Sequence, residues 1–130
     1  MHRVLLAEDN KLNQVVAAGT LQKLGYIIEI VDGGVDAVEA CKRSDFDAVL
    51  MDVMMPDMDG YEATSRIRAH ESARGERHVP IIGLSARAMD GDREIALAAG
   101  FDDYLTKPLR EDLLKEALLR WVGAPLGVAR

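Results

Sequence analysis

The chain has 130 residues, of which 48% are hydrophobic and 29% charged, and its formal net charge is −6. This length and composition predict one globular domain built around one core. The acidic balance and the absence of a Lys/Arg cluster argue against a nucleic-acid surface. No apolar run approaches the roughly 20 residues that a membrane-spanning helix needs, so we expect no membrane insertion.

The N-terminus and the cysteine content both indicate a cytoplasmic protein. Residues 1–7 meet an acid, Glu8, too soon to form a secretory signal peptide. The single Cys41 cannot form an internal disulfide, which fits a reducing compartment.

Five short runs of residues are typical of strands. In chain order they cover 4–7, 27–31, 48–51, 81–84 and 104–105. The first, third and fourth runs are uniformly apolar, as strands buried on both faces are. Glu29 interrupts the second run, and the fifth is short and flanked by polar residues. We therefore expect the second and fifth strands at the edges of a sheet.

A helical pattern follows each strand. The predicted helices run from the cap Asn10 to Leu24, from the turn at 32–34 to about Ser44, over about 61–69, over about 92–99, and along the apolar stripe within 113–121. Residues 70–78 are polar and contain a glycine, which predicts a loop. We place the domain at 1–123 and interpret 124–130 as a tail or linker.

This βα alternation predicts an α/β fold: a five-stranded parallel sheet of order 2-1-3-4-5, flavodoxin-like, with helices on both faces. In this strand order the helices after the first and third strands lie on opposite faces of the sheet, so a crevice forms between the ends of these two strands. Ligands bind at such a switch point. Three acids, Glu8, Asp9 and Asp52, follow or end those two strands and should converge. Ser85 and Lys107, at the ends of the fourth and fifth strands, should flank them.

Carboxylates brought this close repel one another unless a cation joins them. Mg²⁺ takes carboxylates, carbonyls and water as ligands, and Lys107 adds a compact positive charge. A cation and a lysine beside a carboxylate favour the binding of a phosphoryl group, and attack by Asp52 would give an aspartyl phosphate. Ser85 could donate a hydrogen bond to the phosphoryl oxygens.

These residues resemble the response-regulator receiver domains of two-component signalling, most of all those attached to hybrid histidine kinases. The resemblance covers residues 3 to about 122. The matching motifs lie at 8–13 (EDNKLN), 51–60 (MDVMMPDMDG), 84–86 (LSA), 88–89 (AM) and 100–108 (GFDDYLTKP).

The resemblance implies a role for each motif residue. Asp52 would be the phosphoacceptor, taking a phosphoryl group from a phosphohistidine of a histidine kinase or a histidine phosphotransfer protein. Asp9, Asp52 and the backbone carbonyl of Met54 would bind Mg²⁺, with Glu8 acting on the metal through water. Lys107 would contact the phosphoryl group. The Ser85 hydroxyl would move toward the phosphoryl group while the Tyr104 ring turns inward.

Further residues are implicated by the same resemblance. The peptide bond to Pro108 should be cis, and Met54 and Arg87 should tune the lifetime of the phosphate. Asn13 and Val16 should contact the phosphodonor protein. The face made by the fourth strand, the fourth helix and the fifth strand should change on phosphorylation and bind partners. The face made by the fourth helix, the fifth strand and the fifth helix could serve dimerisation.

Simpler interpretations apply to single residues. Asp9 could only cap a helix, Lys107 could be a solvated surface residue, and Tyr104 could be packing. Asp57 and Asp59 suggest a calcium loop, but the ligand spacing fails. A capping box from Asp59 to Glu62 fits better, so we expect both acids at the start of the third helix.

Three other functions compete with a phosphoryl-accepting switch. An aspartyl phosphatase would carry a general acid two residues after its nucleophile, where this chain has Met54, so we expect no enzyme acting on small substrates. A flavin or nucleotide binder would need phosphate-binding donors where Glu8 and Asp9 stand. A degenerate, non-phosphorylated scaffold would have lost one of the site positions, and none is lost.

Overall fold

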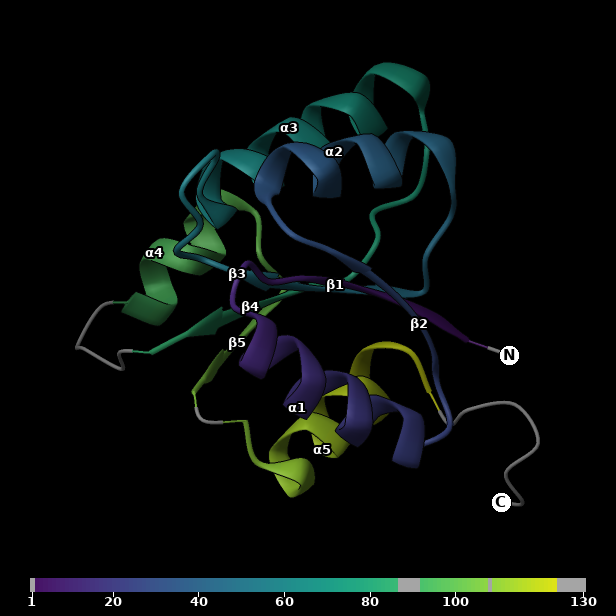
Figure 1. The fold of residues 1–130 in the computed structure, drawn as a ribbon. Coiled ribbons are helices and arrows are strands. Elements are labelled where there is room, and N and C mark those ends of the chain that lie inside the picture. Colours follow the sequence, from purple (N-terminus) through teal and green to yellow (C-terminus); the bar gives the residue numbers. More distant parts are fainter. Residues whose placement is uncertain (1, 87–91, 108, 124–130) are drawn as a thin grey trace.

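The computed structural model describes residues 2–86, 92–107 and 109–123. Strands and helices alternate along the chain five times, as predicted (Figure 1). The elements are β1 (Arg3–Ala7), α1 (Lys11–Lys23), β2 (Ile27–Val31), α2 (Gly34–Arg43), β3 (Ala48–Asp52), α3 (Gly60–Arg74), β4 (Ile81–Ser85), α4 (Asp92–Ala99), β5 (Asp103–Thr106) and α5 (Glu111–Trp121). No helix in the described ranges is long and apolar enough to cross a membrane.

The five strands form one parallel sheet in the order β2-β1-β3-β4-β5, which confirms the predicted topology. Helices α2, α3 and α4 cover one face, and α1 and α5 cover the other (Figure 1). Side chains alternate between the two layers because neighbouring residues of a strand point to opposite faces. Within β1, for example, Leu5 packs beneath α2 and α3, whereas Val4 and Leu6 pack against α1 and α5.

Burial separates the central strands from the edges, again as predicted. Every residue of β3 and β4 is buried, as are four of the five in β1. The edge strand β2 has no fully buried residue, and Ile27 and Ile30 are exposed. The carboxyl ends of β1 and β3 therefore meet inside the sheet, where the predicted site lies.

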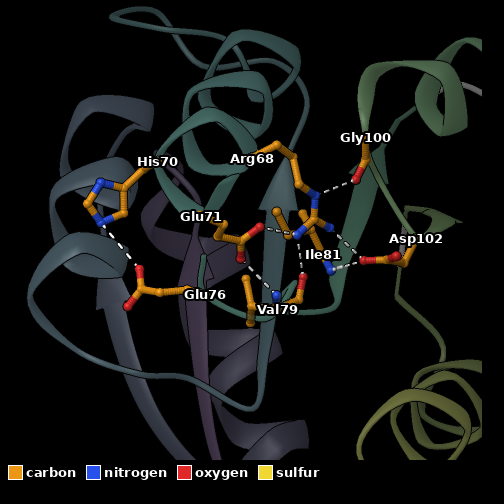
Figure 2. A network of polar contacts seen from close by, with 8 residues as sticks. All are labelled: Arg68, His70, Glu71, Glu76, Val79, Ile81, Gly100 and Asp102. Atoms are coloured by element: carbon orange, nitrogen blue, oxygen red, sulfur yellow. Dashed lines mark hydrogen bonds and ion pairs between the residues drawn. The ribbon is translucent and has the colours of Figure 1, made fainter. Parts of the chain in front are cut away.

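Helix α3 is longer than predicted. It continues to Arg74 and ends at Gly75, whose φ of +67° is left-handed, so the predicted loop at 70–78 is wrong over its first five residues. The polar side chains of this last part are not all solvated. Glu71 is buried and binds Arg68 and the backbone N–H of Val79 (Figure 2). Contacts with residues beyond the helix thus stabilise its final turn.

Helix α1 begins at the predicted cap but is rotated relative to its apolar pattern. The side chain of Asn10 accepts a hydrogen bond from the Asn13 N–H at 3.0 Å. The buried residues of the helix are Gln14, Ala17 and Leu21, whereas Leu12, Val15 and Val16 are exposed. An apolar surface on α1 therefore remains in contact with solvent.

The two acids after Met55 cap different helices. Asp59 caps α3 by accepting from the Glu62 N–H at 2.8 Å, as predicted. Asp57 instead accepts from the backbone of Gly34 and Val35 at the start of α2. The expectation that both acids begin α3 is therefore wrong for Asp57.

Candidate functional site

Three carboxylates meet at the carboxyl ends of β1 and β3. Asp52 is the last residue of β3, and Glu8 and Asp9 follow β1. One carboxylate oxygen from each lies within 4.8 Å of the others. Glu8 and Asp52 are only 2% and 4% exposed, whereas Asp9 is exposed. The structure thus brings together the three acids that the strand order predicts to converge.

Lys107 joins the two buried carboxylates. Its Nζ donates to Glu8 Oε1 at 2.7 Å and to Asp52 Oδ2 at 3.0 Å. Burial lowers the pKa of Lys107, but the hydrogen bonds and charges of Glu8 and Asp52 raise it by more, so the net pKa is raised. Lys107 is therefore charged at neutral pH. We call Glu8, Asp9, Asp52 and Lys107 the acidic site.

Backbone N–H groups and one buried amide hold the carboxylates in place. The Asn10 N–H donates to Glu8 Oε2 and the Met54 N–H donates to Asp52 Oδ1, both at 3.2 Å. The amide of Gln14 donates to the backbone carbonyl of Glu8 at 2.6 Å and to Asp32 Oδ1 at 2.6 Å. These contacts fix the acidic site before any ligand arrives.

The donor set of the acidic site fits Mg²⁺. Three negative carboxylates face one lysine, which leaves two negative charges uncompensated within the cluster. Mg²⁺ binds through one or two carboxylates together with carbonyls and waters, and its double charge would balance the excess. The exposed Asp9 leaves one side of the cluster open to solvent.

Ser85 and Tyr104 lie on the strands beside the acidic site. Ser85 ends β4, one residue beyond the position that pairs with Asp52, and it is 5% exposed. The Lys107 N–H donates to the Ser85 carbonyl at 2.6 Å. Tyr104 of β5 pairs with Gly83, and its ring is already buried at 9% exposure.

The remaining predicted site residues lie at the edge of the cluster or outside the described ranges. The side chain of Met54 is 73% exposed, Val16 is 52% exposed, and Asn13 is half-buried on α1. Arg87 and Pro108 lie outside the described residues, so their predicted roles stay predictions. The same holds for the predicted tail, 124–130.

Sequence reasoning missed the contacts of two residues: Gln14, which bonds the Glu8 carbonyl, and Asp57, which caps α2. Gln14 lies within the stretch interpreted as the apolar stripe of α1, and a glutamine among apolar neighbours was the available signal. Asp57 gave none, because its partners Gly34 and Val35 precede it by more than twenty residues and present only backbone N–H groups.

Comparison with known proteins agrees with this geometry. The model of the response regulator receiver domain matches residues 4–119. Sensor protein GacS of Pseudomonas syringae pv. syringae is 44% identical over 124 residues, which cover 95% of this chain but 14% of GacS.

Two solved structures share the fold. One is the receiver domain of sensor histidine kinase PA1611 from Pseudomonas aeruginosa PAO1, which has a magnesium ion coordinated in its active-site cleft. It is 46% identical to this chain with a TM-score of 0.84, and the match covers 95% of this chain and 98% of the PA1611 chain. The Saccharomyces cerevisiae Ssk1 receiver domain, crystallised with the phosphotransfer protein Ypd1, is 30% identical with a TM-score of 0.86, covering 97% and 93%. The chain therefore belongs to the response regulator receiver domains, the phosphoacceptors of two-component signalling.

Proposed function

We propose that this chain is a signalling switch that takes a phosphoryl group from a phosphohistidine onto Asp52. The partner would be a histidine kinase or a histidine phosphotransfer protein. The observation that carries the proposal is the placement of Asp52, a nearly buried carboxylate at a strand end, between Lys107 and two further acids.

The transfer exchanges one bond to phosphorus for another. A carboxylate oxygen of Asp52 forms a bond to phosphorus while the phosphorus–nitrogen bond of the phosphohistidine breaks, and the imidazole nitrogen keeps the electron pair. The Met54 N–H and Lys107 hold the two oxygens of Asp52 in a fixed orientation before the reaction. The Lys107 ammonium, which also bonds Glu8, can stabilise the charge of the transferring phosphoryl group.

Asp9, Asp52 and the Met54 carbonyl would hold Mg²⁺, with Glu8 acting through water. The metal supplies positive charge that lets an anionic phosphoryl group approach the acids. Support comes from the uncompensated charge of the cluster and from the magnesium bound by the PA1611 receiver domain.

Phosphorylation would be read through Ser85 and Tyr104. The Ser85 hydroxyl would donate to a phosphoryl oxygen, and because the Tyr104 ring is already buried, we propose that this movement restrains the ring more than it draws it in from solvent. The change would alter the face formed by β4, α4 and β5, which would bind partners, while the face formed by α4, β5 and α5 would bind a second copy. The Asp52 phosphate would be lost slowly, at a rate set by Met54 and Arg87.

The phosphodonor would dock beside the acidic site on α1. The exposed Leu12 and Val16, together with Asn13, line an apolar cavity of about 180 Å³ that reaches Glu8 and Lys107. An apolar surface next to a reactive carboxylate suits a protein that must bring its histidine close to Asp52. The Ssk1 receiver domain, crystallised with Ypd1, shows that a related domain binds a phosphotransfer protein.

Phosphotransfer kinetics with two kinds of donor test both parts of the proposal. A phosphorylated histidine phosphotransfer protein and acetyl phosphate are each offered to the wild type, Asp52→Asn, Val16→Asp and Ile27→Asp. Ile27 is the control because it is an apolar residue with 45% exposure at the start of the edge strand β2, at the end of the sheet away from the acidic site. We expect Asp52→Asn to accept from neither donor, and Val16→Asp to slow transfer from the protein donor alone.

Two outcomes would contradict the proposal. Labelling of Asp52→Asn at the wild-type level would remove Asp52 from its role. Equal rates for Val16→Asp and Ile27→Asp with the protein donor would remove α1 as the docking surface.

A further inference from the structure

Asp57 connects the loop after β3 to the first turn of α2. Its Oδ1 accepts from the Gly34 N–H and its Oδ2 from the Val35 N–H, both at 3.2 Å. The first N–H groups of a helix lack partners within the helix, and Gly33 at the N-cap has no side chain to supply one. Asp57 therefore caps a helix that began more than twenty residues earlier in the chain.

The loop and the helix approach each other too closely for most side chains. A Cβ on Gly33 would lie 2.6 Å from both carboxylate oxygens of Asp57, and a Cβ on Gly34 would collide with the backbone oxygen of Met58. Two successive glycines thus allow residues 57–58 to lie directly on the start of α2. The loop at residues 57–58 and the start of α2 are therefore closely packed against each other.

The same loop carries the backbone next to Asp52. Its near end is fixed because Val53 and Met55 are buried in the core and the Met54 N–H donates to Asp52 Oδ1. Its far end is fixed because the Gly60 N–H donates to the Val53 carbonyl at 3.0 Å. Asp57 lies between these ends and holds the outer part of the loop against a separate element.

We propose that Asp57 is a positioning residue for metal binding: its hold on α2 keeps the loop in the conformation in which the Met54 carbonyl can serve as a ligand. This inference rests on the proposed Mg²⁺ site. Burial raises the pKa of Asp57, but hydrogen bonds from backbone N–H groups, among them those of Val35 and Gly34, lower it by more, so the carboxylate is charged at neutral pH.

Three variants separate positioning from charge. Asp57→Ala removes the bridge and the charge. Asp57→Glu keeps the charge, but its extra methylene moves the carboxylate away from the place where it accepts from the Gly34 and Val35 N–H groups. Asp36→Asn is the matched control, because it removes a charge from the exposed first turn of the same helix without touching the loop. Each variant is first shown to be folded by circular dichroism at the temperature used.

Isothermal titration with MgCl₂ then gives the dissociation constant. We expect it to rise about tenfold in both Asp57 variants, as for other residues that orient a metal ligand, and to stay unchanged in Asp36→Asn. Phosphorylation by acetyl phosphate should need correspondingly more Mg²⁺ in the Asp57 variants, but its rate at saturating Mg²⁺ should recover. Hydrogen exchange at the Gly34 and Val35 amides, measured without metal, should become faster.

The outcomes distinguish this inference from the proposed function. If the wild type binds no Mg²⁺, the proposed metal site fails and the inference fails with it. If the wild type binds Mg²⁺ and Asp57→Ala or Asp57→Glu binds it equally well, the inference alone is overturned. Should Asp57→Ala fail to fold, wild-type affinity in Asp57→Glu would still overturn the inference, and weakened affinity would support it.

Discussion

Two clusters of buried charge lie at opposite ends of the same sheet, and they are built differently. At the amino ends of β4 and β5, Arg68 binds Glu71 and Asp102, a group that we call the Arg68 network (Figure 2). At the carboxyl ends of β1 and β3 lies the acidic site, in which three carboxylates meet a single cation, Lys107, among the residues that the structure describes.

The Arg68 network satisfies its own groups. The guanidinium donates to both carboxylates and to the carbonyls of Gly100 and Val79, at 2.7–3.0 Å. The Val79 N–H donates to Glu71, and the Ile81 N–H donates to Asp102, each at 2.8 Å. Every charge in this cluster thus has partners that the fold itself supplies.

The acidic site leaves its charge unbalanced. Burying charge is costly, so a fold that served stability alone would be expected to pair or replace these acids. In the acidic site the two buried acids, Glu8 and Asp52, share one lysine, and Asp9 adds a third carboxylate. Such an excess of charge is typical of sites that bind or react. The contrast is what we expect if the Arg68 network stabilises the fold and the acidic site, as proposed, takes up a cation and a phosphoryl group.

Removing the guanidinium should have the largest effect. We expect Arg68→Met to lower the free energy of unfolding by about 3–5 kcal/mol, because the buried Glu71 would keep an uncompensated charge and the half-buried Asp102 would lose its ion pair. Urea unfolding measures the loss. Phosphorylation by acetyl phosphate at a temperature where the variant is folded should persist. A loss below about 1 kcal/mol would show that the network is not a stabilising unit.

Asp103 offers a pH-dependent test of the same end of the sheet. Its carboxylate is 3% exposed and accepts from the Trp121 indole at 3.0 Å, the Tyr104 N–H, Arg93 and Arg120. Burial raises the pKa of Asp103, but these hydrogen bonds and charges lower it by more, to a net value below the usual 3.8. The stabilisation is therefore present above pH 3.8 and is lost as pH falls through the lower pKa of the folded state.

We expect Asp103→Asn to lose about 2 kcal/mol at pH 7, since it gives up charge-assisted hydrogen bonds. The gap from the wild type should close as the pH is lowered below 3.8, because a protonated Asp103 resembles asparagine. Urea unfolding at a series of pH values measures the gap, with the exposed Asp45→Asn as control. A gap that stays constant down to pH 2 would contradict the lowered pKa.

The smallest expected effect has the opposite sign. Asp9 repels Glu8 and Asp52 and has no ion pair in the described part of the chain, so Asp9→Asn should stabilise the metal-free protein by about 1 kcal/mol. Mg²⁺ should raise the melting temperature of the wild type by mass action and that of Asp9→Asn by much less. If Asp9→Asn were instead less stable than the wild type without metal, the acidic site would not be electrostatically unbalanced.

Some of this architecture follows directly from local sequence. The uniformly apolar runs at 48–51 and 81–84 predicted central strands, and Glu29 marked an edge. Because parallel strands align their carboxyl ends, the residues that follow such runs could be brought together without coordinates, which was enough to assemble the acidic site.

Contacts between residues far apart in the chain could not be predicted from the sequence. Arg68 and Asp102 are separated by 34 positions, and neither residue type signals its partner. For the same reason the predicted third helix is too short. Residues 70–74 have the composition of a solvated loop, and the sequence does not show that Glu71 binds the Val79 N–H. The rotation of α1 could not be predicted either. It buries Gln14, whose partners Glu8 and Asp32 are not evident from the sequence.

We propose above that the acidic site, with its unbalanced charge, accepts a phosphoryl group on Asp52 in the presence of Mg²⁺. Intact-mass spectrometry after incubation with acetyl phosphate tests it most directly, using the wild type with MgCl₂, the wild type with EDTA, and Asp52→Asn with MgCl₂. We predict the mass of one added phosphoryl group in the first sample and in neither of the others. Equal modification in all three samples would contradict the account.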